Sequence, residues 1–278
     1  MTPPMTPGTP LFECRDVHYA YLGRFPALGG IDIRISQGER IALVGANGSG
    51  KSTLLNLLDG LIFPNRGTVT YLGKALTEEA FLDEKFSVEF RREVGLVFQN
   101  PDVQLFCPTV REEIAFGPLQ LGMDEQTVKT RMAHIADTLK IIHLLDRSPH
   151  QLSVGEKRKV AFAAVLAGEP NVLLLDEPTA GLDPQTSTHL IEMLATAAGS
   201  RKTIITATHD LHIIEDIADK VYVFGQDRRI AACGSPAEIL ADTPLLQANN
   251  LVHRHSRHAS DHRVMKTLAS HGTQAVRL

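Results

Sequence analysis

A glycine-rich segment at residues 45–52 has the residue types and spacing that binding a nucleotide phosphate requires. It reads Gly-Ala-Asn-Gly-Ser-Gly-Lys-Ser and matches the P-loop pattern, in which glycines precede a lysine and a hydroxyl residue. Glycines let successive backbone N–H groups turn toward a phosphate, and the start of the following helix adds its positive dipole end. The predicted ATP-binding residues here are Gly45, Asn47, Gly48, Ser49, Gly50, Lys51, Ser52 and Thr53.

The polar side chains of this segment have separate predicted tasks. Lys51 should span the β- and γ-phosphates, Ser52 should hold Mg²⁺, and Thr53 should lie within reach of the α-phosphate. ATP and Mg²⁺ are therefore the predicted cofactors. A glycine-rich turn without a ligand is the alternative, but an apolar strand pattern at residues 41–44 precedes the segment and a helical pattern follows it, as the motif requires.

Two adjacent acids, Asp176 and Glu177, follow an apolar run at residues 172–175. In a doubly wound sheet, ligands lie at the carboxyl ends of the strands, where this pair would stand. Asp176 is the predicted Mg²⁺ partner through water, and Glu177 is the predicted general base for the attacking water. Such a pair alone could equally be acids facing solvent, and the P-loop elsewhere in the chain favours the catalytic interpretation.

The elements that must position these residues follow an alternating pattern. Short apolar runs at residues 41–44, 94–98, 172–175, 203–207 and 221–224 alternate with longer helical patterns. This alternation predicts an α/β fold with a mostly parallel sheet, of the P-loop NTPase (RecA-like) class. Residues 11–21 and 31–35 alternate more strictly between apolar and polar, so we expect a small antiparallel N-terminal sheet beside the main one.

Between residues 99 and 153 the strand signal disappears. Thr109 and Glu112 have the spacing of a capping box, and Val128, Met132 and later apolar residues to Ile142 recur at helical spacing. We predict an ATPase domain over residues 11–245 with a helical subdomain inserted at about 100–152. Residues 1–10 are predicted to be a flexible extension, and residues 246–278 a His-rich, flexible tail.

Composition limits the classes of function. The 278 residues carry a formal net charge of −4, which argues against broad nucleic-acid binding. The longest apolar run, residues 160–167, is far short of the ~20 residues of a membrane helix. The first ten residues lack the pattern of a signal peptide, and three scattered cysteines suit a reducing cytosol.

Further motifs resemble those of ABC transporter ATPases. Residues 152–156, Leu-Ser-Val-Gly-Glu, resemble the ABC signature, usually Leu-Ser-Gly-Gly-Gln, and residues 180–183 resemble the D-loop. Gln99 resembles the Q-loop glutamine and His209 the switch histidine, while Tyr21 stands where the family has an adenine-stacking aromatic. Tyr19 is the alternative for that last position. The resemblance covers residues 11–240 and implies the family's inserted α-helical subdomain.

The resemblance implies a role for each matched residue. Gln99 would contact Mg²⁺ or the attacking water, and His209 would hold the γ-phosphate. The signature would bind the γ-phosphate held by a partner subunit, so a dimer with two shared sites is implied. The residues carried over for this shared site are Ser153, Gly155, Glu156 and Asp183.

The signature region departs from the family pattern. Val154 replaces a glycine and Glu156 a glutamine, which adds bulk and negative charge near the bound phosphate. Three cations follow at the start of the same helix, against the preference of the helix dipole. Either they face an anion or they form a solvated basic face: Lys157, Arg158 and Lys159.

Residues 97–106 and 115–118 are similar to stretches of energy-coupling-factor importers, especially the cobalt and nickel branch. This resemblance implies import driven by ATP, integral-membrane partner subunits, a second ATPase subunit that is a twin or a relative, and a peripheral place on the cytoplasmic side of the membrane. The alternatives are a vitamin importer of the same type, a soluble ABC ATPase and a binding module without activity.

Four histidines in the tail are candidate ligands for nickel or cobalt, which imidazole binds well. The alternative is a basic tail that contacts anionic lipid or has no role, because the region from residue 251 has five cations and one acid. The four candidates are His253, His255, His258 and His262.

Overall fold

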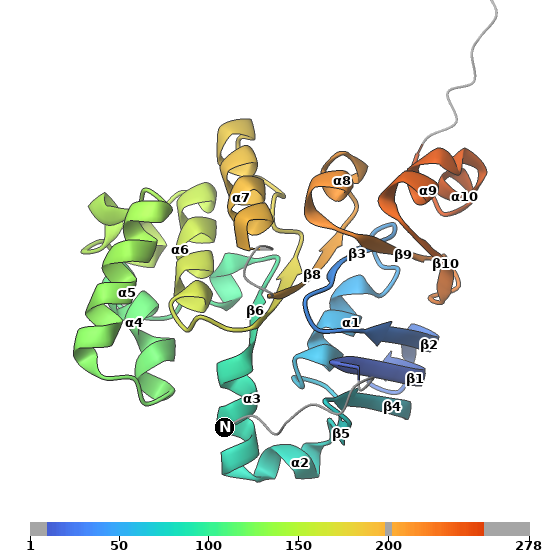
Figure 1. Ribbon diagram of the computed structural model, residues 1–278, viewed down its shortest axis with the longest axis horizontal. Helices are drawn as coiled ribbons and strands as arrows, with labels where there is room; N and C mark the ends of the chain where they lie inside the picture. The colour runs from blue at the N-terminus through green and yellow to red at the C-terminus, as the bar shows by residue number, and fades with distance from the viewer. Residues whose placement is uncertain (1–9, 198–201, 253–278) are drawn as a thin grey trace, which may run out of the picture.

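The computed structural model describes residues 10–197 and 202–252. The main sheet has the strand order β10-β9-β3-β8-β7-β6, and its neighbours are parallel except for β9 and β10. Figure 1 shows this sheet at the centre of the molecule. The predicted mostly parallel α/β fold is therefore confirmed. Its strands are β3 (Arg40–Val44), β6 (Val94–Val97), β7 (Val172–Asp176), β8 (Thr203–Thr208), β9 (Lys220–Phe224) and β10 (Ile230–Gly234).

A second, antiparallel sheet has the order β2-β1-β4-β5. Its strands are β1 (Phe12–Tyr21), β2 (Phe25–Ile35), β4 (Arg66–Tyr71) and β5 (Lys74–Ala75). Helix α1 (Lys51–Leu58) packs between the two sheets, and Leu54, Leu55 and Leu58 on it are fully buried. Burying three leucines from one short helix stabilises its attachment by several kcal/mol, at roughly 1.5–3 kcal/mol each. The helix that follows the P-loop is thus held on both faces.

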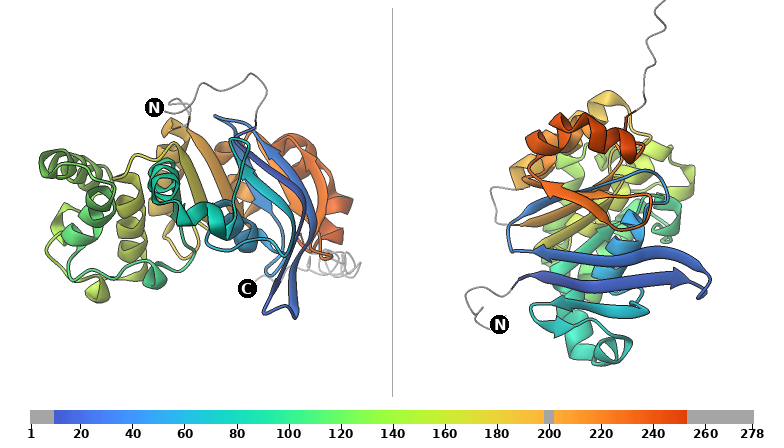
Figure 2. Two further views of the ribbon diagram at one scale, coloured as in Figure 1. Left: turned by 90° about the horizontal axis from the view of Figure 1, so that it is seen from below. Right: turned by 90° about the vertical axis from the view of Figure 1, so that its right-hand side faces the viewer.

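The helical part of the chain lies on one side of the main sheet, and the C-terminal elements lie on the other (Figures 1 and 2). Thr109 caps α4 through the predicted capping box with Glu112. The helix predicted from the apolar spacing that extends to Ile142 ends sooner than expected, because Ile142 lies beyond α5 in a short 3₁₀ turn. The long helices are α4 (Val110–Gln120), α5 (Glu125–Thr138) and α6 (Val154–Leu166).

Several elements lay outside the sequence prediction. Strands β4, β5 and β10 are short or largely exposed, and α2 (Glu78–Leu82) and α3 (Glu84–Glu93) have a weak apolar pattern. The predicted end of the ATPase domain at residue 245 falls inside α10 (Thr243–Ala248), whose Leu246 is buried. The chain therefore packs on the domain beyond that boundary, because Leu246, Leu251 and Val252 join the cluster under α9 (Pro236–Ala241).

Candidate functional site

The P-loop segment connects β3 to α1 and adopts a conformation that glycine favours. Gly48 and Gly50 have φ values of 79° and 107°. A Cβ atom on Gly50 would lie 2.5 Å from the carbonyl oxygen of Ala27, so β2 closes against the loop. Gly45 and Ser49 lie beneath it, where a Cβ atom on Gly45 would lie 2.5 Å from Ser49 Oγ. The loop therefore presents its backbone N–H groups with little room to rearrange.

A cavity of about 380 Å³ lies above this loop. Eight of the predicted phosphate, base and water-binding residues line it together with the candidate general base. Four further lining residues, Phe25, Pro26, Ala27 and Arg228, were missed by the motif analysis because they belong to no motif. The predicted residues that line the cavity are Tyr21, Asn47, Gly48, Gly50, Lys51, Ser52, Thr53, Gln99 and Glu177.

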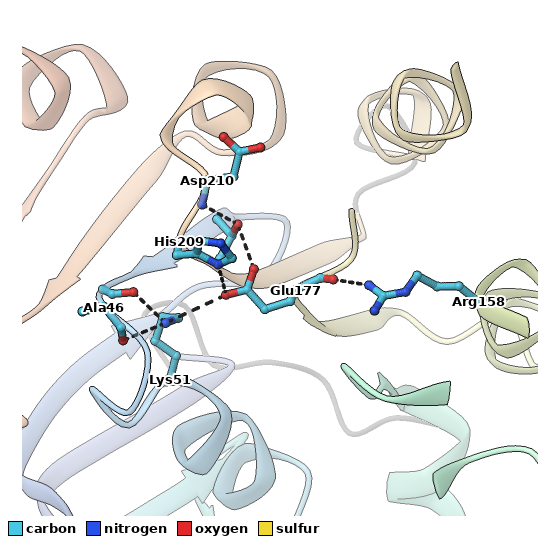
Figure 3. Close-up of polar contacts among 8 residues, drawn as sticks. Ala46, Lys51, Arg158, Glu177, His209 and Asp210 are labelled. Atoms are coloured by element: carbon cyan, nitrogen blue, oxygen red, sulfur yellow. Dashed lines mark hydrogen bonds and ion pairs between the residues drawn. The ribbon is translucent and has the colours of Figure 1, made fainter. Parts of the chain in front are cut away.

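Lys51 is buried, with 6% of its surface exposed. Its Nζ donates to the carbonyl oxygens of Gly45 and Ala46 at 2.7 and 3.2 Å and lies 4.0 Å from Glu177 Oε1 (Figure 3). Burial lowers the pKa of Lys51, and the charges of Glu177 and Asp176 oppose that shift. A buried ammonium with only two carbonyl acceptors and one carboxylate in reach is well suited to bind an anionic ligand.

Glu177 lies at the end of β7 with a left-handed φ of 48°. Its backbone N–H donates to Ala207 on β8, so two neighbouring strands hold it. Its Oε1 lies 2.8 Å from His209 Nδ1, and Thr208 Oγ1 donates to Oε2 at 3.4 Å (Figure 3). The carboxyl ends of β7 and β8 thus bring the candidate base and His209 into direct contact.

Asp176 has the features of a cation ligand. Its side chain is buried, and its Oδ1 atom has no hydrogen-bond partner in the described part of the chain. Burial raises the pKa of Asp176, and a hydrogen bond from Ser52 opposes that shift. A buried carboxylate oxygen without a donor is costly unless a cation binds it. The donor set of Asp176 and Ser52, both oxygen ligands, fits Mg²⁺.

Arg158 links the candidate base to Gln99. Its side chain is 5% exposed, and its guanidinium donates to the backbone carbonyl of Glu177 and, at 2.7 Å, to that of Gln99. The open alternative of a solvated basic face is therefore wrong for Arg158. Lys157 donates to Asp102 at 2.6 Å, and Lys159 is half-buried. The sequence pattern alone could not assign this linking role to Arg158, because its acceptors lie on two other elements.

Tyr21 and Tyr19 occupy different environments. Tyr21 is 41% exposed and lines the cavity, and its hydroxyl lies 3.2 Å from Thr53 Oγ1. Tyr19 packs against the core under the antiparallel sheet and meets the Tyr21 ring edge-on, with centroids 4.9 Å apart. Only Tyr21 of the two offers a ring surface to a ligand in this cavity, while its stacking role stays a prediction.

The sequence of the chain matches the family described as ABC transporter over residues 28–180, more than half of its length. The chain belongs to the ABC transporter ATP-binding family. The predictions of the family, of the fold class and of an ATPase are thereby confirmed.

Three similar proteins illustrate the breadth of this ABC family. The nickel import ATP-binding protein NikO of Rhodobacter capsulatus is 50% identical over 88% of this chain and 96% of its own length. The energy-coupling factor transporter ATP-binding protein EcfA of Methanothermobacter thermautotrophicus is 41% identical over 87% of this chain and 76% of its own length. The structure of cbiO1 from Clostridium perfringens, part of the ABC transporter complex cbiONQ, is 35% identical, covers 87% and 95%, and has a TM-score of 0.71.

The ABC signature residues lie on α6, outside the cavity lining. Ser153 is the exposed N-cap of α6, and Glu156 completes a capping box with it. Gly155 follows in the first turn, and Asp183 caps α7 (Pro184–Ala197) through the backbone N–H of Thr186 at 3.0 Å. The predicted roles of Ser153, Gly155, Glu156 and Asp183 concern a partner subunit, so they stay predictions.

The four candidate histidines of the tail, at positions 253, 255, 258 and 262, lie outside the described residues. Within residues 10–197 and 202–252, no group of three or more His, Cys, Asp or Glu side chains is arranged to hold a metal ion. In the same part of this ABC protein, no helix has both the length and the apolar character to cross a bilayer.

Proposed function

We propose that this chain is the ATP-hydrolysing subunit of an energy-coupling-factor importer. The observation that carries the proposal is the convergence of Lys51, Glu177 and His209 at one edge of the main sheet. There Glu177 Oε1 lies 2.8 Å from His209 Nδ1 and 4.0 Å from Lys51 Nζ. A carboxylate, an imidazole and an ammonium within this distance of a phosphate-binding loop suit phosphoryl transfer to water, which depends on positioning and charge stabilisation.

Each residue then has a defined part in hydrolysis. The P-loop N–H groups and Lys51 bind the phosphates, Thr53 lies near the α-phosphate, and Tyr21 stacks on the adenine. Glu177 accepts a proton from the attacking water, and His209 orients Glu177 and contacts the γ-phosphate. Gln99 positions the water or the cation.

Ser52 and Asp176 are the proposed Mg²⁺ ligands, Asp176 through water. When bound, the cation supplies neutralisation of charge that develops on the phosphate oxygens. Ser52 and Asp176 otherwise hold each other in place, since Ser52 donates to the Asp176 carboxylate. The unpaired Oδ1 of Asp176 supports this assignment.

The signature residues at the start of α6 do not line the nucleotide cavity of their own chain. Ser153 is exposed and absent from the lining of its own cavity. We therefore propose a dimer, with a twin or a related ATPase, in which Ser153, Gly155, Glu156 and Asp183 seal the partner's nucleotide. Integral-membrane subunits complete the importer, which places this chain peripherally on the cytoplasmic face of the membrane.

Nickel or cobalt ions are the proposed cargo. Support comes from the NikO relative, a nickel import ATP-binding protein that is 50% identical to this chain. A vitamin cargo is the second candidate, because the EcfA relatives are named for the coupling factor alone and share 40–41% identity. A soluble, non-transport ABC ATPase is the remaining alternative.

The ATPase proposal is tested by substituting the base and the lysine separately. Glu177→Gln should lower hydrolysis by at least about 100-fold and still bind ATP, since only the general base is lost. Lys51→Ala should weaken ATP binding itself. Radiolabelled ATP in a phosphate-release assay and a filter-binding assay distinguishes them. Near-normal hydrolysis by Glu177→Gln would remove the assigned base.

The importer proposal needs a test of partners and cargo. The tagged chain is purified from solubilised membranes, and co-isolating integral-membrane subunits are identified by mass spectrometry. The isolated complex in vesicles loaded with ATP is then offered radioactive nickel, cobalt or a vitamin mixture. ATP-dependent accumulation of one cargo assigns the substrate, and recovery of this chain without any membrane subunit contradicts the importer.

A further inference from the structure

The turn at residues 225–229, between β9 and β10, reaches the nucleotide cavity from the C-terminal side of the fold. The backbone N–H of Gly29 on β2 donates to the Arg228 carbonyl at 3.0 Å, and Gly225 donates to Arg229 at 2.8 Å. A Cβ atom on Gly29 would lie 3.2 Å from the Asp227 carbonyl oxygen. Figure 1 shows the β9–β10 hairpin beside β2. The turn is therefore fixed against the strand that also closes on the P-loop.

Arg228 occupies the one position of this turn that favours glycine. Its φ is +64°, in the left-handed region where a side chain with a Cβ atom is strained. Glycine would adopt this conformation without strain. A strained non-glycine residue beside a cavity indicates that its side chain has a task other than stability.

Arg228 lines the same cavity as Lys51, and the residue is half-buried. In the described part of the chain, Arg228 forms no ion pair with a carboxylate, unlike Arg40 and Arg91. The neighbouring Asp227 carboxylate accepts instead from the backbone N–H of Arg229, at 3.2 Å. Arg228 thus brings an uncompensated positive charge and a planar set of donors to the cavity.

From these contacts we infer that Arg228 binds the phosphates of the nucleotide, as a specificity residue outside the motifs of the P-loop fold. The inference rests on the proposed function of the cavity as a nucleotide site. Phosphate is favoured over the base because Tyr21 already supplies the cavity with a ring for stacking. A guanidinium matches the oxygens of a phosphate with two parallel donors, whereas a neutral base offers it no charge.

The test compares the affinities of ADP and adenosine for the full chain by calorimetry. Arg228→Gln should weaken ADP binding about 5- to 10-fold and leave adenosine binding unchanged, since only ADP carries phosphates. The loss should shrink as salt is raised from 50 to about 500 mM, because salt screens the charge. Arg229→Gln removes the same charge from the next residue of the turn, which lies outside the cavity lining, and should leave both affinities unchanged.

A second variant separates binding from folding. Arg228→Gly relieves the strained backbone, so its Tm should rise by about 2–4 °C while its ADP affinity falls as in Arg228→Gln. Stability and binding then change in opposite directions, which a merely structural role does not produce.

Two outcomes overturn the inference. The first is an ADP affinity of Arg228→Gln equal to that of the unaltered chain while Lys51→Ala loses ADP, which leaves the proposed ATPase function intact. The second is an equal weakening of ADP and adenosine, which assigns Arg228 to the base. If the unaltered chain binds no ADP, the proposed function itself fails.

Discussion

Glu156 shows how one residue of the ABC signature can serve its own helix. Its Oε2 accepts from the backbone N–H and the hydroxyl of Ser153, both at 2.8 Å, and Ser153 Oγ accepts from the Glu156 N–H at 3.3 Å. These hydrogen bonds lower the pKa of Glu156, and the bond from the Ser153 backbone N–H has the largest effect. The carboxylate therefore caps α6 while it carries negative charge toward the surface that Ser153 exposes.

Glu156→Gln should make α6 slightly less stable and the dimer more receptive to ATP. The pKa of Glu156 is lower in the folded state than in the unfolded state, so its charged form stabilises the protein. This stabilisation is present above the unfolded pKa of about 4.3 and is lost as pH falls through the pKa of the folded state. The variant should lose about 0.5 kcal/mol in urea unfolding at pH 7.5 and almost none near pH 3. Its apparent KM for ATP should fall, since a negative charge near the γ-phosphate is removed.

Glu112→Gln is the matched control for Glu156→Gln. Glu112 completes the same capping box with Thr109 on α4, with its Oε2 3.1 Å from the Thr109 backbone nitrogen. It should lose a similar free energy of unfolding and leave the KM for ATP unchanged. A KM that shifts equally in both variants would mean that helix stability, and not the signature charge, controls the effect.

At the residue scale, sequence reasoning found the groups that belong to local patterns and missed those that act across elements. Lys51 and Glu177 were predicted from residues next to them in the chain. Arg158 was singled out only as one of three cations with an open role, and Arg228 was not singled out, because the carbonyls that hold Arg158 and the cavity that Arg228 lines exist only after folding. Ser153 was predicted as a binding residue, but its N-cap geometry says nothing of the partner's phosphate.

At the scale of elements, Arg158 connects α6 with β6 and β7. Replacing it with methionine leaves the carbonyls of Gln99 and Glu177 without their donor and removes a buried charge. We expect Arg158→Met to lower the free energy of unfolding by about 2–3 kcal/mol and to slow single-turnover hydrolysis at least about 10-fold, with a smaller change in ATP affinity. The reason is that the misplaced groups are the base and the water-positioning loop, whereas the P-loop is untouched.

Lys159→Met tests whether loss of any cation from α6 has this effect. Lys159 is half-buried one residue further along the helix. The Lys159→Met variant should keep the free energy of unfolding of the unaltered chain, and its single-turnover rate should stay within about twofold. Chemical denaturation and rapid-quench kinetics measure the two quantities. Equal slowing in both variants would contradict the link through Arg158.

A second connection between elements joins the end of α1 to α3. The Arg91 guanidinium donates to the carbonyl and the carboxylate of Asp59, both at 2.7 Å, and Asp59 caps the C-terminus of α1. Burial raises the pKa of Asp59 to about 6, against the lowering effect of Arg91. The charged carboxylate is thus unfavourable at this site, where the negative end of the helix dipole adds to the cost.

This raised pKa predicts a loss of stability as pH rises. The folded state holds the proton more tightly than the unfolded state, so stability from this group is full below pH 4 and is lost as pH rises through about 6. The contribution lost is about 2–3 kcal/mol. The Asp59→Asn variant has no carboxyl group to ionise at this site. In urea unfolding, the free energy of unfolding of the variant minus that of the unaltered chain should therefore increase by that amount between pH 4.5 and 7.5. Parallel pH curves would contradict the prediction.

The sequence pattern predicted which helices and strands exist better than it predicted where they begin and end. The central strands of the main sheet are rich in apolar and β-branched residues, because both their faces are buried. The edge strand β10 buries none of its five residues, and only Ile230 among them is β-branched, so it lacks the strong strand signal of the central strands. The end of the domain was set too early because Leu246 packs on α9 in a segment whose apolar residues are sparse.

At the scale of the whole molecule, the proposed dimer places α6 of one copy over the P-loop of the other. Three bodies meet in each copy: the antiparallel sheet, the main sheet and the helical part (Figure 2). The cavity lies between the first two, whereas Ser153 belongs to the third. In the proposed dimer a second molecule brings its signature helix to the phosphate end of the nucleotide, and we expect this contact to depend on bound ATP.

Disulfide trapping tests that dependence. Ser153→Cys combined with Asn47→Cys, in a chain that also carries Glu177→Gln to preserve ATP, should form an intermolecular crosslink only when ATP is present. Asn47 is an exposed residue of the P-loop. Cys233 is exposed and must first be replaced by serine, whereas Cys14 and Cys107 are buried and can remain. A disulfide requires Cα atoms within about 7 Å, so it reports contact and not mere association.

Thr109→Cys in place of Ser153→Cys is the matched control, since Thr109 is the N-cap of α4 with the same capping box outside the signature. The signature pair should give at least about tenfold more dimer on non-reducing gels with ATP than without nucleotide, and the control pair should give the same small amount in both. The closed dimer fails if the signature pair crosslinks equally without ATP, or if the Thr109→Cys pair traps as efficiently. In either case α6 of one copy would not seal the nucleotide of the other, and hydrolysis would have to be completed within a single chain.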